Sequence, residues 1–253
     1  MIWQPVSGCG DRCRVGGDEQ AAPGTATLRL VTLAGVLLGG FLLVPLLRGA
    51  ALCGLARAML AVLGVRLVRC GPAPRPGSLL VANHVSWLDV VVLLAVTPAR
   101  LVAKGEVGGW PGIGALAGLS GAIFLDRSRP KRLPATVAEV TAALRGGRSV
   151  AVFPEGTTFC GPERGRFRPA MFQAAIDAGA PVVPAWISYG STAAAFIGDD
   201  TLWASVRRVS ALRSLTVTLV TAPALRPAPG ADRRTLARAA HASLGVAGYR
   251  LAA

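Results

Sequence analysis

Ser78-Leu79-Leu80-Val81-Ala82-Asn83-His84-Val85-Ser86-Trp87-Leu88-Asp89 is the stretch of this chain that decides its fold. The apolar run 78–82 predicts a short buried strand that ends next to His84. A helix that begins near Ser86 would carry Asp89 back towards the imidazole within about one turn. A carboxylate bonded to one ring nitrogen fixes the imidazole tautomer, and the other nitrogen is then free to take a proton from a hydroxyl. The spacing alone also fits a histidine that merely caps a helix.

Short apolar runs alternate with helical patterns from residue 65 onward. The predicted strands are residues 65–68, 78–82, 100–103, 122–125, 149–153, 182–188 and 215–220. The predicted helices are residues 87–96, 111–118, 130–145, 170–178 and 232–244. This alternation is typical of an α/β domain in which helices cover a mostly parallel central sheet. Functional side chains in such sheets collect where strands end.

An apolar segment precedes this domain. Residues 30–47 carry no charge and lie between Arg29 and Arg48, and a second apolar stretch covers residues 50–65. One interpretation is a single membrane span, with the arginine-rich remainder on the cytoplasmic side. The other is a two-helix hairpin that lies in one leaflet, held by arginines at the level of the lipid headgroups. Both predict membrane association.

Composition suggests four parts in the chain. Residues 1–26, which are rich in glycine, proline and polar groups, are expected to be a disordered lead-in. Residues 27–64 would form the membrane-associated helices, and 65–222 the α/β domain. Residues 223–253 would form a proline-rich connector and a C-terminal helix.

Charge and cysteine content restrict the possible partners. The formal net charge of +14 suggests an anionic partner such as a membrane surface. Nucleic-acid binding is not expected, because few aromatic residues interleave with the arginines and no recognition motif is present. Cys9 and Cys13 provide two ligands, but no second cysteine or histidine cluster in the sequence completes a tetrahedral site. Free thiols and no metal site are therefore expected.

Two more predicted strand ends carry polar side chains. The run 121–125 delivers Arg127, and the run ending at Phe153 leads into Pro154-Glu155-Gly156-Thr157-Thr158. Gly156 permits close approach of the backbone, and the threonines offer hydroxyls. An arginine together with such a turn predicts a cradle for a phosphate or another anionic group.

Four blocks in order, Asn83-His84-x4-Asp89, Gly121-x-Ile123-Phe124-x-Asp126-Arg127, Phe153-Pro154-Glu155-Gly156-Thr157 and Val182-Val183-Pro184, resemble those of the glycerolipid acyltransferase family. The resemblance covers about residues 75–190. It implies transfer of a fatty acyl group from acyl carrier protein or coenzyme A to the hydroxyl of a lysolipid. The catalytic domain would then lie on the cytoplasmic face of the cell membrane.

The resemblance also implies roles for individual residues. His84 would be the general base and Asp89 would orient it. Asn83 and Pro184 would support the site. The acceptor's polar head would be bound by Arg127, Glu155, Gly156, Thr157 and Thr158. No metal or cofactor is expected, because a thioester is already activated.

The acceptor implied first is 1-acylglycerol-3-phosphate, which would yield phosphatidate for phospholipid biosynthesis. Lyso-ornithine lipid is the alternative, because Thr158 stands where the phosphatidate-forming pattern usually has arginine or serine. An alternative of another class is a catalytically silent membrane-binding module. The intact pair of His84 and Asp89 argues against it.

Overall fold

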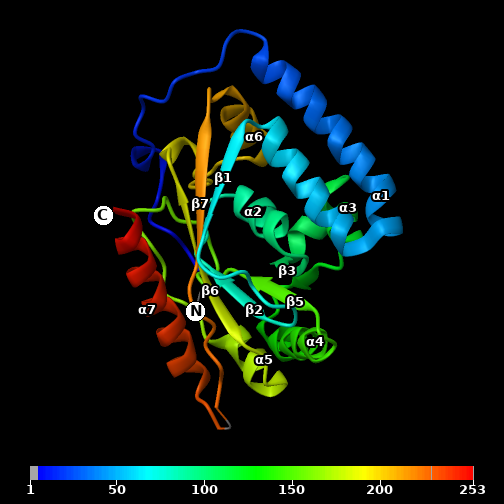
Figure 1. The fold of residues 1–253 in the computed structure, drawn as a ribbon, viewed down its shortest axis with the longest axis vertical. Helices are drawn as coiled ribbons and strands as arrows, with labels where there is room; N and C mark the ends of the chain where they lie inside the picture. Colours follow the sequence, from blue (N-terminus) through cyan, green and yellow to red (C-terminus); the bar gives the residue numbers. More distant parts are fainter. Residues whose placement is uncertain (1–4, 229, 253) are drawn as a thin grey trace.

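Within residues 5–228 and 230–252, which the computed structural model describes, seven strands form one sheet in the order β1-β7-β6-β2-β5-β3-β4 (Figure 1). The strands are β1 (Val65–Cys70), β2 (Leu79–Ala82), β3 (Ala99–Lys104), β4 (Ile123–Leu125), β5 (Ser149–Val152), β6 (Val182–Tyr189) and β7 (Leu215–Thr221). Neighbouring strands are parallel except β6 and β7. All seven predicted strands and the mostly parallel sheet are thereby confirmed.

Helices cover both faces of this sheet. They are α1 (Thr25–Val62), α2 (Leu88–Val96), α3 (Ile113–Leu119), α4 (Leu133–Arg145), α5 (Ala170–Ala178), α6 (Leu202–Ala211) and α7 (Arg233–Ala252). Successive residues of a strand point to opposite faces. Leu80 and Ala82 accordingly belong to one core cluster, with α1, α2 and α6. Leu79 and Val81 belong to the other, with α4, α5 and α7. Burial on both faces explains why β2 is apolar throughout.

Helix α6 was not predicted from the sequence. The side chain of Thr201, just before this helix, caps its first turn by accepting a hydrogen bond from the N–H of Ala204 at 3.2 Å. Its buried face includes Ser205 and Ser210 next to Val209. Because these serines replace apolar residues at core positions, the helical period of apolar residues is interrupted and the sequence pattern is weak.

Helix α1 folds back on itself. A methyl group added at Gly40 would lie 2.5 Å from Cδ2 of Leu55, whereas these positions would be about 22 Å apart in a straight helix. Figure 1 shows the resulting outer (blue) and inner (cyan) arms. The bend falls in a stretch that contains Pro45 and Gly49, residue types that disfavour a straight helix. The first arm, Thr25–Leu43, is long and apolar enough to cross a membrane by length and composition.

The arginines of α1 dock on the α/β domain. Arg29 donates hydrogen bonds to the carbonyl oxygens of Leu212 at 2.6 Å and Ser210 at 3.1 Å. Arg57 donates to the carbonyl oxygen of Ala95 at 2.8 Å. These two side chains therefore hold both arms on the domain, where the hairpin interpretation had placed arginines among lipid headgroups.

Residues 5–24 pack on the α/β domain, contrary to the expectation of a disordered lead-in. Residues 1–4 lie outside the described part. Gln20 forms a β-bridge with Leu212, and the main-chain N–H of Arg213 donates to the carbonyl of Glu19 at 2.8 Å. Arg14 contacts Asp200 at 2.8 Å. The polar composition reflects side chains that bind the domain surface through hydrogen bonds and ion pairs, which hydropathy does not register.

The C-terminal part packs into the same core as the rest of the domain. Leu236, Ala237, Ala240 and Leu244 of α7 are buried against the sheet. In the connector, Leu225 bridges Val182 at the beginning of β6. Helix α7 is longer than predicted and ends at Ala252. The four-part division of the chain stays a prediction.

Candidate active site

The end of β2 and the first turn of α2 bring His84 and Asp89 together. Nδ1 of His84 lies 2.8 Å from Oδ2 of Asp89. The same oxygen accepts hydrogen bonds from the main-chain N–H groups of Val85 at 2.6 Å and Ser86 at 2.8 Å. The carboxylate thus satisfies the free N–H groups at the start of the helix and orients the imidazole at the same time.

The second oxygen of Asp89 binds a residue that sequence reasoning missed. The hydroxyl of Tyr189 donates to Oδ1 at 2.5 Å, and Asp89 is completely buried. Burial, and then the charge of Asp89, raise the pKa of Tyr189 well above its ordinary value, so the phenol stays a neutral donor. Tyr189 ends β6, which pairs with β2. A single tyrosine at a strand end has no sequence signal until that pairing is known.

The imidazole of His84 presents its other nitrogen to the surface. Its ring stacks on Phe153 with a centroid separation of 4.1 Å and an interplanar angle of 12°. The side chain is 21% exposed. Among the described residues only Nδ1 of this ring has a hydrogen-bond partner. Nε2 is therefore placed to meet a hydroxyl, as a general base requires.

Asn83 and Pro184 lie where β2 meets β6, next to this pair. The side-chain amide of Asn83 donates to the carbonyl of Ile187 at 2.9 Å and accepts from its N–H at 2.7 Å. Pro184 lies opposite Val81 in the parallel register of β2 and β6. Asn83 therefore ties the end of β2 to β6 through two hydrogen bonds, and the supporting role of Pro184 stays a prediction.

Glu155 links the turn after β5 to His84. One carboxylate oxygen accepts the main-chain N–H of His84 at 2.6 Å, and the other accepts that of Gly165 at 3.0 Å. Glu155 is 4% exposed. Burial raises its pKa to about 7, against the opposing effect of the two N–H donors. Both oxygens are thus engaged by the protein backbone.

Arg127 and Arg168 lie at the turn around Gly156, and Lys104 lies near Arg127. Nη1 of Arg127 donates to the carbonyl of Gly156 at 2.5 Å. Burial lowers the pKa of Arg127. The negative charge of Glu106 opposes this decrease, and the positive charge of Arg168 increases it. Partial burial, and then the charge of Arg127, lower the pKa of Lys104. Lys104 and Arg168 were not assigned from the sequence. The signal for Lys104 is its place at the end of β3, next to β4, which leads to Arg127.

The two threonines of the turn have different surroundings. The hydroxyl of Thr158 donates to the carbonyl of Phe196. Thr157 lines a cavity of about 340 Å³ together with Arg168 and the N-terminal residues Pro5 and Val6. A methyl group added at Gly156, where φ is +79°, would lie 2.7 Å from Cγ of Pro5. Glycine is therefore needed both for the turn and for the close passage of the N-terminal segment.

Known proteins resemble this chain over most of its length. The Acyltransferase family profile matches residues 68–188. A 1-acyl-sn-glycerol-3-phosphate acyltransferase of Neisseria meningitidis serogroup B is 34% identical over 180 residues, which cover 68% of this chain and 71% of the relative. A lyso-ornithine lipid O-acyltransferase of Pseudomonas aeruginosa is 36% identical over 189 residues, 72% of each chain.

A solved structure shares the fold. The 1-acyl-sn-glycerophosphate acyltransferase of Thermotoga maritima superposes with a TM-score of 0.68 at 20% sequence identity. The match covers 90% of this chain and 95% of the other. The likeness thus extends beyond the α/β domain to most of the N-terminal region.

Proposed function

The chain belongs to the glycerolipid acyltransferase family, and from this premise we propose that it acylates the free hydroxyl of 1-acylglycerol-3-phosphate, forming phosphatidate. The acyl donor would be a thioester of acyl carrier protein or coenzyme A. The observation that carries the proposal is the contact of 2.8 Å between His84 and the buried Asp89, with the free Nε2 at the surface. A silent membrane-binding module would have no use for this arrangement.

In the proposed reaction, His84 acts as the general base. Nε2 of His84 takes the proton of the acceptor hydroxyl while the oxygen attacks the thioester carbonyl. The new ester C–O bond forms, the C–S bond breaks, and the imidazolium returns its proton to the leaving thiolate. Asp89 stabilises the imidazolium in between. A base placed in this way contributes about 10²–10⁴-fold to the rate.

The charges near the turn favour a phosphate monoester acceptor. Arg127 lies close enough to Lys104 to lower the pKa of that lysine, and Arg168 lies close enough to Arg127 to lower the pKa of Arg127. Glu106 is the acidic group that opposes both effects. Excess positive charge of this kind suits a dianionic phosphate. We assign the head group to these cations and to the turn 156–158, with Glu155 holding the turn in place.

Lyso-ornithine lipid remains the second candidate acceptor. It is favoured by the relative from Pseudomonas aeruginosa and by Thr158, which carries no charge. However, Thr158 is engaged with the carbonyl of Phe196, and Lys104 and Arg168 add positive charge near Arg127. Lysophosphatidate is thus the better fit.

The N-terminal hairpin would lie in the cytoplasmic leaflet. On the first arm Leu28, Val31, Leu38 and Leu42 are each more than 60% exposed. Trp110, Ile113 and Leu119, on or next to α3, are also exposed, and α3 contacts α1. Because Arg29 and Arg57 attach both arms to the α/β domain, this apolar surface enters one leaflet without the first arm leaving the domain.

The test is an acyl-transfer assay with the purified full-length protein in detergent. A labelled long-chain acyl thioester is offered with lysophosphatidate or with lyso-ornithine lipid, and His84→Ala serves as the blank. The proposal is supported if the wild type forms labelled phosphatidate and His84→Ala does not. Product from lyso-ornithine lipid alone would assign the second acceptor. Full activity of His84→Ala would refute the mechanism. If the wild type turns over no thioester, the result would favour a catalytically silent membrane-binding module.

A further inference from the structure

Three cysteines from two distant parts of the chain meet next to the active-site loop. Cys9 and Cys13 lie in the N-terminal segment, and Cys160 follows the turn after β5. Their sulfur atoms all lie within 4.8 Å of one another. Cys9 and Cys160 are each 5% exposed. The sequence supplies only the first two as neighbours, so this cluster exists because the N-terminal segment packs against the loop.

A carboxylate lies next to one of these sulfurs, at the exposed side of the cluster. Oε2 of Glu163 lies 3.6 Å from Sγ of Cys9. In a tetrahedral zinc site with Zn–S of about 2.3 Å and Zn–O of about 2.1 Å, neighbouring sulfur and oxygen ligands are about 3.6 Å apart. Neighbouring sulfurs in such a site are about 3.8 Å apart. The three sulfurs lie within 4.8 Å of one another, so small side-chain movements would bring them to this spacing, and a rotation of the exposed Glu163 side chain would bring its carboxylate to the same centre.

The local backbone is suited to ligands in this arrangement. Three residues separate Cys9 from Cys13, a spacing within the range found in structural zinc sites. The short 3-10 helix Asp11–Cys13 bends this segment, with the N–H of Cys13 donating to the carbonyl of Gly10 at 2.9 Å. The main-chain N–H of Cys160 donates to Sγ of Cys9 at 3.4 Å. Donors of this kind stabilise thiolates that bind a metal.

We propose that Cys9, Cys13 and Cys160, with Glu163 as the fourth ligand, bind one structural Zn²⁺ ion. Thiolates select soft or borderline cations such as zinc, and four protein ligands leave no open position for catalysis. A disulfide would join two of the three sulfurs and leave the third without a partner. The convergence of all three with a carboxylate favours a cation.

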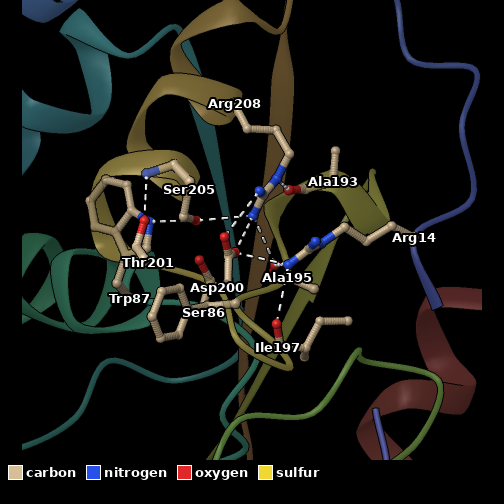
Figure 2. Close-up of polar contacts among 12 residues, drawn as sticks. Arg14, Ser86, Trp87, Ala193, Ala195, Ile197, Asp200, Thr201, Ser205 and Arg208 are labelled. Carbon is tan, nitrogen blue, oxygen red and sulfur yellow. Dashed lines mark hydrogen bonds and ion pairs between the residues drawn. The ribbon is translucent and has the colours of Figure 1, made fainter. Parts of the chain in front are cut away.

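The ion would fasten the N-terminal segment to the loop that contacts the catalytic histidine. The N–H of Phe159, next to Cys160, donates to the carbonyl of His84 at 2.8 Å. A second attachment of the same segment lies farther along the chain. Figure 2 shows the guanidinium groups of Arg14 and Arg208 on the carboxylate of Asp200, at 2.8 and 2.5 Å. The metal site and this ion-pair cluster together fix residues 9–14 on the domain.

The test measures bound metal and does not depend on acyl transfer. Untagged full-length protein is purified under reducing conditions without chelator, and zinc is quantified by plasma mass spectrometry. We expect about one zinc per chain, as a closed four-ligand site would retain. After exchange with Co²⁺, a thiolate-to-cobalt charge-transfer absorption should appear. Cys13→Ser should lose most of the zinc, whereas Cys70→Ser, a half-buried cysteine of β1 outside the cluster, should retain it.

Glu163→Gln separates the fourth ligand from the thiolates. This variant should keep the charge-transfer absorption but release cobalt to a chelator at lower chelator concentration than the wild type. Wild-type protein without zinc that binds no cobalt would overturn the proposal. A disulfide within the cluster in reduced preparations, located by peptide mapping, would overturn it as well. Both measurements use the wild type, so they hold even if a variant fails to fold.

Discussion

The carboxylate of Glu155 accepts the main-chain N–H of His84, with 2.6 Å between the oxygen and the nitrogen. These residues are 71 positions apart in the sequence and follow different strands. The bond joins the turn at Gly156, which Arg127 also contacts, to the residue that carries the general base. The turn around Gly156 and the His84–Asp89 pair are therefore joined through the carboxylate of Glu155.

Glu155 should make stability depend on pH. Burial raises its pKa in the folded protein to about 7, above the ordinary value of 4.5. Proton binding therefore favours the folded state, and the contribution is complete below pH 4.5 and lost as the pH rises through 7. The free energy of unfolding of the wild type, relative to Glu155→Gln, should fall by about 3 kcal/mol over this range. Denaturant unfolding of both proteins in detergent at several pH values measures it; a constant difference would contradict the raised pKa.

Removing the hydroxyl of Tyr189 should weaken the support of Asp89. Tyr189→Phe deletes a hydrogen bond to a buried carboxylate, which is worth about 1.5–3 kcal/mol of stability. The rate constant kcat should fall as well, but less than in His84→Ala, because three other donors still hold Asp89. KM for the acceptor should not change. Unfolding curves and steady-state kinetics measure these effects, and wild-type values for both would show that the phenol is dispensable.

Arg127 should act on acceptor binding. Arg127→Ala removes a cation and the contact with Gly156, so KM for lysophosphatidate should rise about 10–100-fold while kcat changes little. Lys104→Ala should also raise KM for lysophosphatidate, but by a smaller factor. Arg129→Ala is the matched control, because Arg129 lies in the same loop but its side chain is 64% exposed. An equal effect of Arg129→Ala would show that only general charge attracts the substrate.

The exposed face of the first arm of α1 should set the affinity for membranes. Leu38 and Leu42 are 66% and 63% exposed, and inserting each into lipid is worth about 1.5–3 kcal/mol. Leu38→Glu and Leu42→Glu should each reduce binding to anionic vesicles at least about tenfold. Val15→Glu is the control, because Val15 is 73% exposed but lies in the N-terminal segment. Co-sedimentation with vesicles measures binding; undiminished binding of the leucine variants would exclude this surface.

The strand β2 and the contact that follows it could be predicted from the sequence, because the local hydrophobic pattern and the tertiary structure agree there. Residues 78–82 are buried on both faces, and the α2 turn that brings Asp89 to His84 involves only six consecutive residues. The strand ends that deliver Arg127 and Glu155 were predicted for the same reason. Hydrophobic periodicity carries such information, because burial acts on each strand separately.

Other features depend on contacts between distant residues. Tyr189 reaches Asp89 only because β6 pairs with β2, and Lys104 approaches Arg127 only because β3 pairs with β4. The bend of α1 brings Gly40 against Leu55, and the polar N-terminal segment packs through hydrogen bonds that composition does not reveal. The sequence by itself thus determined the α/β class, the strands and the contact between His84 and Asp89. The tertiary structure alone decided which strand ends meet, what holds Asp89 and Glu155, and that Cys160 joins Cys9 and Cys13, because these depend on strand order and long-range packing.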